Sequence, residues 1–398
     1  MADSRLRIVV TGLAALYPVG GVAWDYLQYA IGFARLGHDV VYHEDSWSWP
    51  YNPVEKTFTA DPAYSVKYID DFFKRYAPGL CGRWHYRHLH ETSYGMSWDA
   101  FDEFARSADL FLNVSGACMI PEQLPQRCEK IFLDTDPGYN QIMLSEKLSW
   151  SENVERWCAS VEAHDQHFTY AENIYAGDCL LPRLDFKWKT TRTPIAVDLW
   201  EPVVHKPLPP RAPWTTIMTW NAFKGPLVHK GVEYFSKGME FEKIIDIPSR
   251  LHLPLKVAVG GTTAPLDRLE EKGWEVADGP EATVTPARYQ DFIAESRGEI
   301  STAKQVYVAM RTGWFSCRSA CYIAAGRPVV VQDTGFKPVI PVGEGVLAFD
   351  TMEEAVEGIR EVEGDYARHA RAALEIAREY FDAEKVLGRM IEDAYRSA

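Results

Sequence analysis

Hydrophobic positions near the start of the chain switch between strand-like and helix-like spacing. Leu6–Thr11 is a short β-branched run, Val22–Leu36 has apolar residues at helical intervals, and His38–His43 is strand-like again. The small-residue loop Gly12–Gly21 separates the first run from the helix. A strand, a glycine-containing loop, a helix and a second strand begin a doubly wound parallel sheet. The pattern therefore predicts an α/β fold.

The same alternation continues to about residue 190. The predicted strands are Asp109–Val114, Lys130–Leu133 and Phe168–Tyr170, and the predicted helices are Ser65–Arg75, Ser97–Arg106 and Asn153–His164. Residues 45–100 are rich in Trp, Tyr, His and Pro. We interpret this stretch as an insertion into the sheet.

A second series follows the proline-rich residues 189–213, which have no helical period and which we interpret as a linker. Its predicted strands are Thr215–Thr219, Lys256–Val259 and Arg327–Val331; its helices are Glu240–Ile247, Arg288–Ser296 and Ser316–Ala325, with long helices after residue 352. We therefore predict two Rossmann-like doubly wound domains, residues 1–190 and 214–375, joined by residues 191–213 and facing across a cleft. Ligands of such sheets bind beyond the carboxyl ends of the strands.

Length and charge narrow the function. A chain of 398 residues is long enough for two domains. Its 42 basic and 56 acidic residues give a net charge of −14, which disfavours nucleic acid and anionic membranes as partners. The seven cysteines form no C-x-x-C pair, so we expect reduced thiols and no zinc site. Without a signal sequence or an apolar run of membrane-spanning length, a cytoplasmic location is expected.

The segment Arg311–Phe336 carries the strongest candidate chemistry. A glycine-containing turn that includes Trp314 leads into a helix whose first residues include Ser316, Arg318 and Ser319. A helix N-terminus offers unpaired N–H groups to an anion, and hydroxyl and guanidinium groups add donors. A strand then brings Asp333 and Thr334 to the same sheet edge. These residues predict an anion-binding site.

The run A-A-G-R-P-V-V-V-Q-D-T-G, ending at Gly335, resembles the donor-domain segment of GT-B glycosyltransferases. The resemblance implies that the helix N-terminus binds the diphosphate of a nucleotide sugar. Phe381–Leu387 also resembles the closing segment of that class, which implies that residues 376–398 form a helix packing back on the first domain. Retaining members carry an E-x7-E pair, but the matching positions here are Gly313 and Cys321. We therefore expect an inverting enzyme or a divergent branch.

The loop Trp220–Gly238 contains three lysines, at positions 224, 230 and 237. Lys237 with Gly238 resembles the K-G dipeptide of related enzymes, and its charge would neutralise a departing diphosphate without a metal ion. Gly261 follows the next strand and is expected to line the nucleoside site. We expect no cofactor beyond the nucleotide-diphosphate sugar, which is a co-substrate.

Candidate acceptor-side and catalytic residues lie in the first domain. Gly20 and Gly21 allow close backbone approach at the cleft, although their loop is not the G-x-G-x-x-G of dinucleotide-binding proteins. An inverting transfer needs a carboxylate or histidine near the acceptor. The candidates are Asp134 at the cleft, Asp136 as first choice of base, His164 and Glu172 as a second group, and His43 to Asp45 as a third.

These observations predict a glycosyltransferase that moves a sugar from a nucleotide-diphosphate sugar to a small-molecule or glycan acceptor in the interdomain cleft. The alternatives are a nucleotide-sugar epimerase and a non-catalytic nucleotide-sugar-binding homologue. A glycosyltransferase acting on DNA bases is disfavoured by the acidic net charge.

Overall fold

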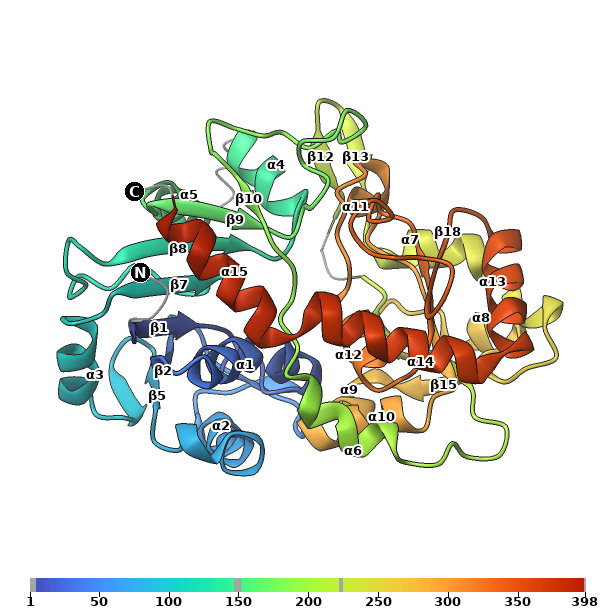
Figure 1. Ribbon diagram of the computed structural model, residues 1–398, viewed down its shortest axis with the longest axis horizontal. Helices are drawn as coiled ribbons and strands as arrows, with labels where there is room; N and C mark the ends of the chain where they lie inside the picture. The colour runs from blue at the N-terminus through green and yellow to red at the C-terminus, as the bar shows by residue number, and fades with distance from the viewer. Residues whose placement is uncertain (1–4, 147–151, 222–224, 397–398) are drawn as a thin grey trace.

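The computed structural model describes residues 5–146, 152–221 and 225–396, and it has two largely parallel sheets with helices packed on them, arranged side by side (Figure 1). The first sheet has the strand order β10-β9-β8-β7-β1-β2-β5-β6, and the second has the order β15-β14-β11-β16-β17-β18. Within the first sheet β6 is antiparallel to β5, and the other neighbours pair in parallel. This arrangement confirms the predicted α/β class with two doubly wound halves.

The first half supplies the first sheet and the helices around it. Its strands are β1 (Arg7–Thr11), β2 (Asp39–Asp45), β5 (Trp84–His88), β6 (Thr92–Gly95), β7 (Leu110–Val114), β8 (Glu129–Asp134), β9 (Gln166–Thr169) and β10 (Lys189–Thr190), with a small hairpin of β3 (Tyr51–Asn52) and β4 (Thr57–Phe58). Its helices are α1 (Gly20–Arg35), α2 (Ala63–Tyr76), α3 (Trp98–Ala105), α4 (Tyr139–Ser145) and α5 (Glu152–Glu162).

The second half repeats the plan. Its sheet contains β11 (Trp214–Thr219), β14 (Leu255–Gly260), β15 (Glu275–Asp278), β16 (Gly298–Ser301), β17 (Val329–Gln332) and β18 (Val346–Phe349), and β12 (Leu227–His229) pairs with β13 (Val232–Tyr234) in a separate hairpin. Its helices are α7 (Lys237–Phe241), α8 (Leu266–Glu271), α9 (Gly279–Ala282), α10 (Pro286–Ala294), α11 (Gln305–Ala309), α12 (Cys317–Ala324), α13 (Met352–Gly364) and α14 (Tyr366–Ile376). None of the helices within the described residues is long and apolar enough to cross a bilayer.

The stretch 45–100 is not an insertion, because β5 and β6 extend the first sheet. β5 has the sequence WHYRH, which lacks the aliphatic residues that mark most buried strands. Its His85 ring nevertheless stacks on Phe101, with ring centroids 4.5 Å apart, and burial lowers the pKa of His85 to about 4. A neutral, stacked imidazole behaves here as an apolar ring. The interpretation as an insertion is therefore wrong, because a strand of aromatic and histidine residues can be buried in a sheet when its rings stack.

Residues 191–213 are packed between the two halves. Ile195 and Trp200 are fully buried, and Ile195 forms a β-bridge with Asp382 near the C-terminus. The Ala196 N–H donates to the side-chain oxygen of Gln28 in α1, over 2.8 Å. The segment also contains the short helix α6 (Glu201–Val204). The connection is therefore fixed to both halves and does not act as a flexible tether.

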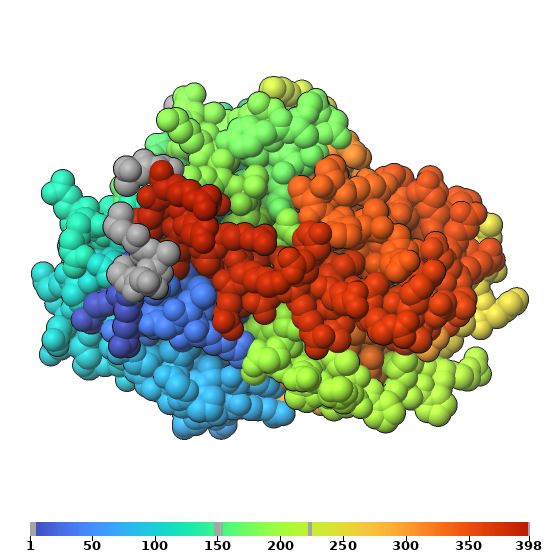
Figure 2. Space-filling model, in the orientation of Figure 1, coloured from blue at the N-terminus to red at the C-terminus, as the bar shows by residue number. Residues whose placement is uncertain are grey.

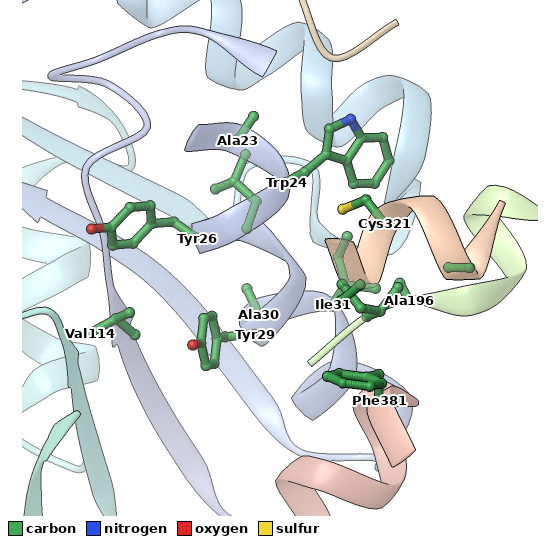
Figure 3. Packing of buried hydrophobic residues seen from close by; sticks show 14 of the residues in the cluster. Ala23, Trp24, Tyr26, Tyr29, Ala30, Ile31, Val114, Ala196, Cys321 and Phe381 are labelled. Atoms are coloured by element: carbon green, nitrogen blue, oxygen red, sulfur yellow. The ribbon is translucent and has the colours of Figure 1, made fainter. Parts of the chain in front are cut away.

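Helix α1 is the element that both halves share. Figure 3 shows its side chains Trp24 and Ile31 packed toward Cys321 of α12 and Phe381, within one buried cluster. The Trp24 indole N–H donates to the carbonyl oxygen of Pro286 over 3.0 Å. Gly32 gives room for α15 (Ala383–Tyr395), since a Cβ at Gly32 would lie 2.6 Å from Leu387.

Helix α15 closes the molecule by returning from the second half to the first (Figure 1). It lies along α1, and the Tyr395 hydroxyl donates to the carbonyl oxygen of Asp109 beside β7 over 3.2 Å. Figure 2 shows the C-terminal segment lying on the surface across both halves. The two halves are thus held together by α1, the connection and α15.

Candidate active site between the two sheets

A cavity of about 810 Å³ lies between the two halves. Its walls come from the carboxyl ends of strands in both sheets and from the helices that follow them. The lining residues of the first half include Gly21, Asp25, Tyr26, Tyr51, Ser115, Thr135, Asp136 and Asn140; those of the second include Thr219, Lys237, Gly261, Tyr289, Lys304, Tyr307, Trp314, Ser316, Cys317 and Arg318. The cavity is therefore at the position where open α/β sheets bind ligands.

The N-terminus of α12 faces this cavity. Ser316, Cys317 and Arg318 line it, and the Ser316 side chain accepts no hydrogen bond from the helix it precedes. The first turn of a helix has backbone N–H groups without intrahelical partners, and they carry the positive end of the helix dipole. The sequence prediction of an anion-binding turn therefore has the required geometry at Ser316.

Arg318 lines the cavity, but its charge is already compensated. Its guanidinium donates to Glu299 over 2.5 Å, to the Ile217 carbonyl oxygen over 2.6 Å and to the Ser301 hydroxyl over 2.9 Å. Glu299 is fully buried, so this pair is part of the framework under α12. Arg318 therefore holds α12 against β11 and β16, and its predicted role in binding the donor stays a prediction.

Lys237 is a basic residue on this side of the cavity for which the described part of the chain provides no ion-pair partner. It begins α7, lines the cavity and forms no ion pair with any residue that the structure describes. Burial lowers the pKa of Lys237 well below its ordinary value, and the nearby charge of Arg318 lowers the pKa further. An arriving anion would restore the charged form. Of the other two lysines, Lys230 lies in the β12–β13 turn, and Lys224 falls outside the described residues.

Two further predicted donor-side residues lie at the cavity. Gly261 follows β14 with a φ of 103°, a conformation that favours glycine, and it lines the cavity. Trp314 lines it as well, with its ring tilted against Tyr307 at a centroid distance of 4.4 Å. The cavity wall is therefore without a side chain at Gly261 and carries a flat ring at Trp314.

Ser319, Asp333 and Thr334 do not reach the cavity, which corrects their predicted role as donor ligands. All three are buried. Asp333 accepts from the Gly335 N–H over 2.8 Å and lies 3.1 Å from the Lys337 ammonium, while the Thr334 hydroxyl donates to the Trp314 carbonyl oxygen over 2.5 Å. These bonds fix the turn that precedes α12, so Asp333 and Thr334 support the site from behind.

The two predicted aspartates after β8 have different environments. Asp134 is fully buried and accepts from the side chains of Asn140 over 2.7 Å and Thr169 over 2.6 Å; burial raises the pKa of Asp134 to about 6, opposed by these hydrogen bonds. It orders the loop and does not line the cavity. Asp136 does line it, where its carboxylate accepts from the Lys304 ammonium and the Tyr307 hydroxyl of the other half.

The second predicted catalytic group lies away from the cavity. His164 is buried, with its ring nitrogens against the Ser160 carbonyl oxygen at 2.6 Å and the Asn113 amide at 3.2 Å, and burial lowers its pKa to about 4. Glu172 forms a buried ion pair with Arg192 at 2.5 Å. Both are structural, which corrects their assignment as catalytic residues.

Of the glycine pair, Gly21 lines the cavity and Gly20 joins the two halves. The Gly20 N–H donates to the Thr283 carbonyl oxygen over 2.5 Å, and a Cβ at Gly20 would lie 2.5 Å from the Thr285 carbonyl oxygen. Gly20 is therefore required for close packing of α1 on the α9–α10 region, and not for a ligand.

The sequence analysis missed Asp25, which lies in α1 and lines the cavity. Its Oδ1 atom is buried and accepts no hydrogen bond, and its only hydrogen-bonding neighbour within the described part of the chain is the Cys317 thiol. Burial raises the pKa of Asp25 to about 6, opposed by the contact with Cys317. The available signal was the single acidic residue of α1, which lies between Trp24 and Tyr26.

No family model and no curated protein matches the sequence. Solved structures do match. An alpha-glucosyltransferase in complex with UDP-glucose and DNA containing an abasic site is 12% identical, covers 98% of this chain and 100% of its own, and superposes with a TM-score of 0.58. Sucrose-phosphate synthase from Thermosynechococcus elongatus is 13% identical, and Anabaena HepE in complex with UDP and glucose is 12% identical. Each of these two matches covers 99% of this chain and 100% of the other chain, with a TM-score of 0.53. The likeness spans the whole chain and confirms the predicted GT-B fold.

Proposed function

We propose that the protein is a glycosyltransferase that moves a sugar from a nucleotide-diphosphate sugar to an acceptor bound between the two halves. The cavity carries this proposal: one wall has a helix N-terminus without a side-chain cap and a lysine, the other wall has a carboxylate, and neither charged group pairs with another residue that the structure describes. A volume of about 810 Å³ suits a nucleotide sugar with room for an acceptor group. The GT-B fold supports the same reading.

On the second-half side, the diphosphate would bind to the N–H groups of the first turn of α12 and to the ammonium of Lys237. Negative charge grows on the diphosphate as the bond to the sugar breaks, so preorganised donors stabilise the transition state more than the ground state. Gly261 would allow the nucleoside to approach the backbone closely. We propose that Lys237 and these amides supply the neutralising charge without a metal ion.

The acceptor would enter over the aromatic residues that follow β2. Tyr51 lines the cavity, its ring lies 5.5 Å from Phe58, and Phe58 in turn lies 6.2 Å from Tyr17. Phe58 and Tyr17 are 51% and 38% exposed. This row of rings leads from the cavity to the surface and favours a small-molecule or glycan acceptor with a flat face. The net charge of −14 favours neither DNA nor RNA.

A thermal-shift screen against UDP, GDP, ADP, CDP, dTDP and their sugar conjugates tests the donor site. A ligand at 100 times its Kd should stabilise the protein by about 2.7 kcal/mol. UDP conjugates come first, since UDP or UDP-glucose is bound in the similar structures. At the same ligand concentration, Lys237→Met should reduce the stabilisation to about 0.4–1.4 kcal/mol. Lys230→Met, which removes a charge from the exposed hairpin turn, should leave it unchanged.

The screen also separates the rival functions. No response to any nucleotide would contradict the proposal. Isomerisation of the nucleotide sugar in the absence of an acceptor would indicate an epimerase, and binding without turnover on any acceptor would indicate a non-catalytic homologue. Tight binding to duplex DNA at low salt would favour a base-modifying enzyme.

A further inference from the structure

Two carboxylates line the cavity from the first half, and their surroundings differ. The Asp136 carboxylate accepts hydrogen bonds from the ammonium of Lys304 and the hydroxyl of Tyr307, both in the second half. Asp25 forms no ion pair with any described lysine or arginine, and its buried Oδ1 atom accepts no hydrogen bond. A carboxylate that is neither paired nor fully hydrated remains a stronger proton acceptor than one held by an ammonium.

The position of Asp25 follows from two packing contacts of α1. The N-terminal end of α1 is held by the bond from the Gly20 N–H to Thr283, and Trp24 is held by its bond to Pro286. Asp25 and Cys317, the first residue of α12, line the same cavity, and the Cys317 thiol donates to the carbonyl oxygen of Trp24, the neighbour of Asp25, over 3.9 Å. The carboxylate therefore lies beside the helix end proposed to hold the diphosphate, but on the opposite domain.

The other titratable groups around Asp25 stay neutral near physiological pH. They are Tyr26 and Tyr29 of α1, Tyr170 after β9, Tyr307 of α11 and Cys317 of α12, and burial contributes to raising the pKa of each of them well above its ordinary value. Tyr29 and Tyr170 are also hydrogen-bonded to each other through their hydroxyls. Asp25 is therefore the member of this group that changes protonation state between pH 5 and 8.

We propose that Asp25 is the general base of the transfer and that the transfer inverts the anomeric configuration. This inference rests on the proposed function. The Asp25 carboxylate takes the proton of the acceptor hydroxyl while the acceptor oxygen forms a bond to the anomeric carbon. The bond from that carbon to the diphosphate oxygen breaks, and its electron pair leaves with the nucleoside diphosphate. The products are the glycoside, the nucleoside diphosphate and protonated Asp25.

The test uses the full chain with UDP-glucose as donor, and with water and a panel of neutral glycosides as acceptors. Release of UDP is followed from pH 4.5 to 8.5 for the wild type, Asp25→Asn, Asp25→Glu and Asp71→Asn. Asp71 is an exposed residue of α2 and provides a matched aspartate outside the cavity. Thermal shift with UDP is measured on the same samples, so that loss of donor binding is separated from loss of turnover.

We expect Asp25→Asn to bind UDP like the wild type and to lower kcat by 100-fold or more. Asp25→Glu should recover part of the rate, and Asp71→Asn should match the wild type. The wild-type rate should fall about tenfold per pH unit below the pKa of the base, and this limb should be absent in Asp25→Asn. A rate within threefold of wild type in Asp25→Asn, or an unchanged pH profile, would overturn the proposal.

A second measurement does not depend on how well the variants fold. NMR of the first glucose or glucoside formed by the wild type should show the β-anomer, because UDP-glucose carries the α-linkage. The α-anomer as first product would contradict the single displacement that Asp25 serves. Bound UDP-glucose with no UDP release at any pH would overturn the role of Asp25 while leaving the donor site intact, whereas absence of UDP binding would overturn the proposed function itself.

Discussion

Each wall of the cavity has one charged side chain in an ion pair and one ionisable side chain outside any ion pair of the described residues. The second group is basic on one wall and acidic on the other. On the second-half wall, Arg318 is compensated by Glu299, and Lys237 forms no ion pair with the described residues. On the first-half wall, Asp136 is compensated by Lys304, and Asp25 forms no ion pair with a lysine or arginine in residues 5–146, 152–221 or 225–396. A free cation suits an anionic leaving group, and a free carboxylate suits proton removal. The difference divides the site into a donor wall and an acceptor wall.

The largest effect should come from removing the unpaired acid. Asp25→Asn should lower turnover by about 10²- to 10⁴-fold and also raise stability at pH 7. Burial raises the pKa of Asp25 from 3.8 to about 6, so ionisation does not oppose folding below pH 3.8, opposes it increasingly between pH 3.8 and 6, and opposes it fully above pH 6. At about 1.4 kcal/mol per pKa unit, the free energy of unfolding should rise by up to about 3 kcal/mol at pH 7. Urea unfolding at pH 7 and pH 4 checks this; a destabilised variant at pH 7 would show that Asp25 has a partner in the folded protein.

Replacing Lys237 should weaken binding of the nucleotide diphosphate. Lys237→Met should lower nucleotide-diphosphate affinity by about 10- to 100-fold, which corresponds to one hydrogen bond to a charged group. Because burial lowers the pKa of free Lys237 and a bound diphosphate raises it, binding should take up a proton, and wild-type affinity should fall as pH rises above the pKa of the free lysine. Calorimetry in two buffers of different ionisation enthalpy measures this uptake. Proton uptake that persists in the variant would assign it to another group.

Removing the paired acid should act mainly on stability. Asp136→Asn leaves Lys304 and Tyr307 without their carboxylate, so we expect a loss of about 1–3 kcal/mol in the free energy of unfolding. Turnover should fall less than in Asp25→Asn. The opposite outcome is a larger loss of rate in Asp136→Asn than in Asp25→Asn, with donor binding intact. It would assign the role of general base to Asp136.

The smallest effect should come from the aromatic row. Phe58→Ala should raise the KM for a ring-bearing acceptor by about three- to tenfold, since one aromatic contact contributes about 0.5–1.5 kcal/mol. The Kd for UDP should not change, because Phe58 is exposed and does not line the cavity. Initial rates at varied acceptor concentration and saturating donor measure the effect. An unchanged KM for the acceptor would show that the acceptor does not bind over Phe58.

Much of the architecture could be predicted because the spacing of hydrophobic residues and the positions of glycines determine strands, helices and turns from nearby residues alone. Leu6–Thr11 and Asp109–Val114 became β1 and β7 nearly as predicted, and the turn before Ser316 reached the cavity as the strand ends required. The failures came where side-chain chemistry depended on neighbours distant in sequence. His85 became apolar by stacking on Phe101, and Arg318 was neutralised by Glu299.

The sequence by itself determined the two α/β halves, strands such as β1, β7 and β11 and the loops at their carboxyl ends, because these follow from spacing along the chain. Only the tertiary structure decided which ionisable groups keep an unpaired charge. Asp25 and Asp136 are both acidic residues near strand or helix ends in sequence, and they differ because α1 packs against α12 while Lys304 reaches Asp136 from the other half. Pairing and desolvation depend on distances between the halves, which no local pattern encodes.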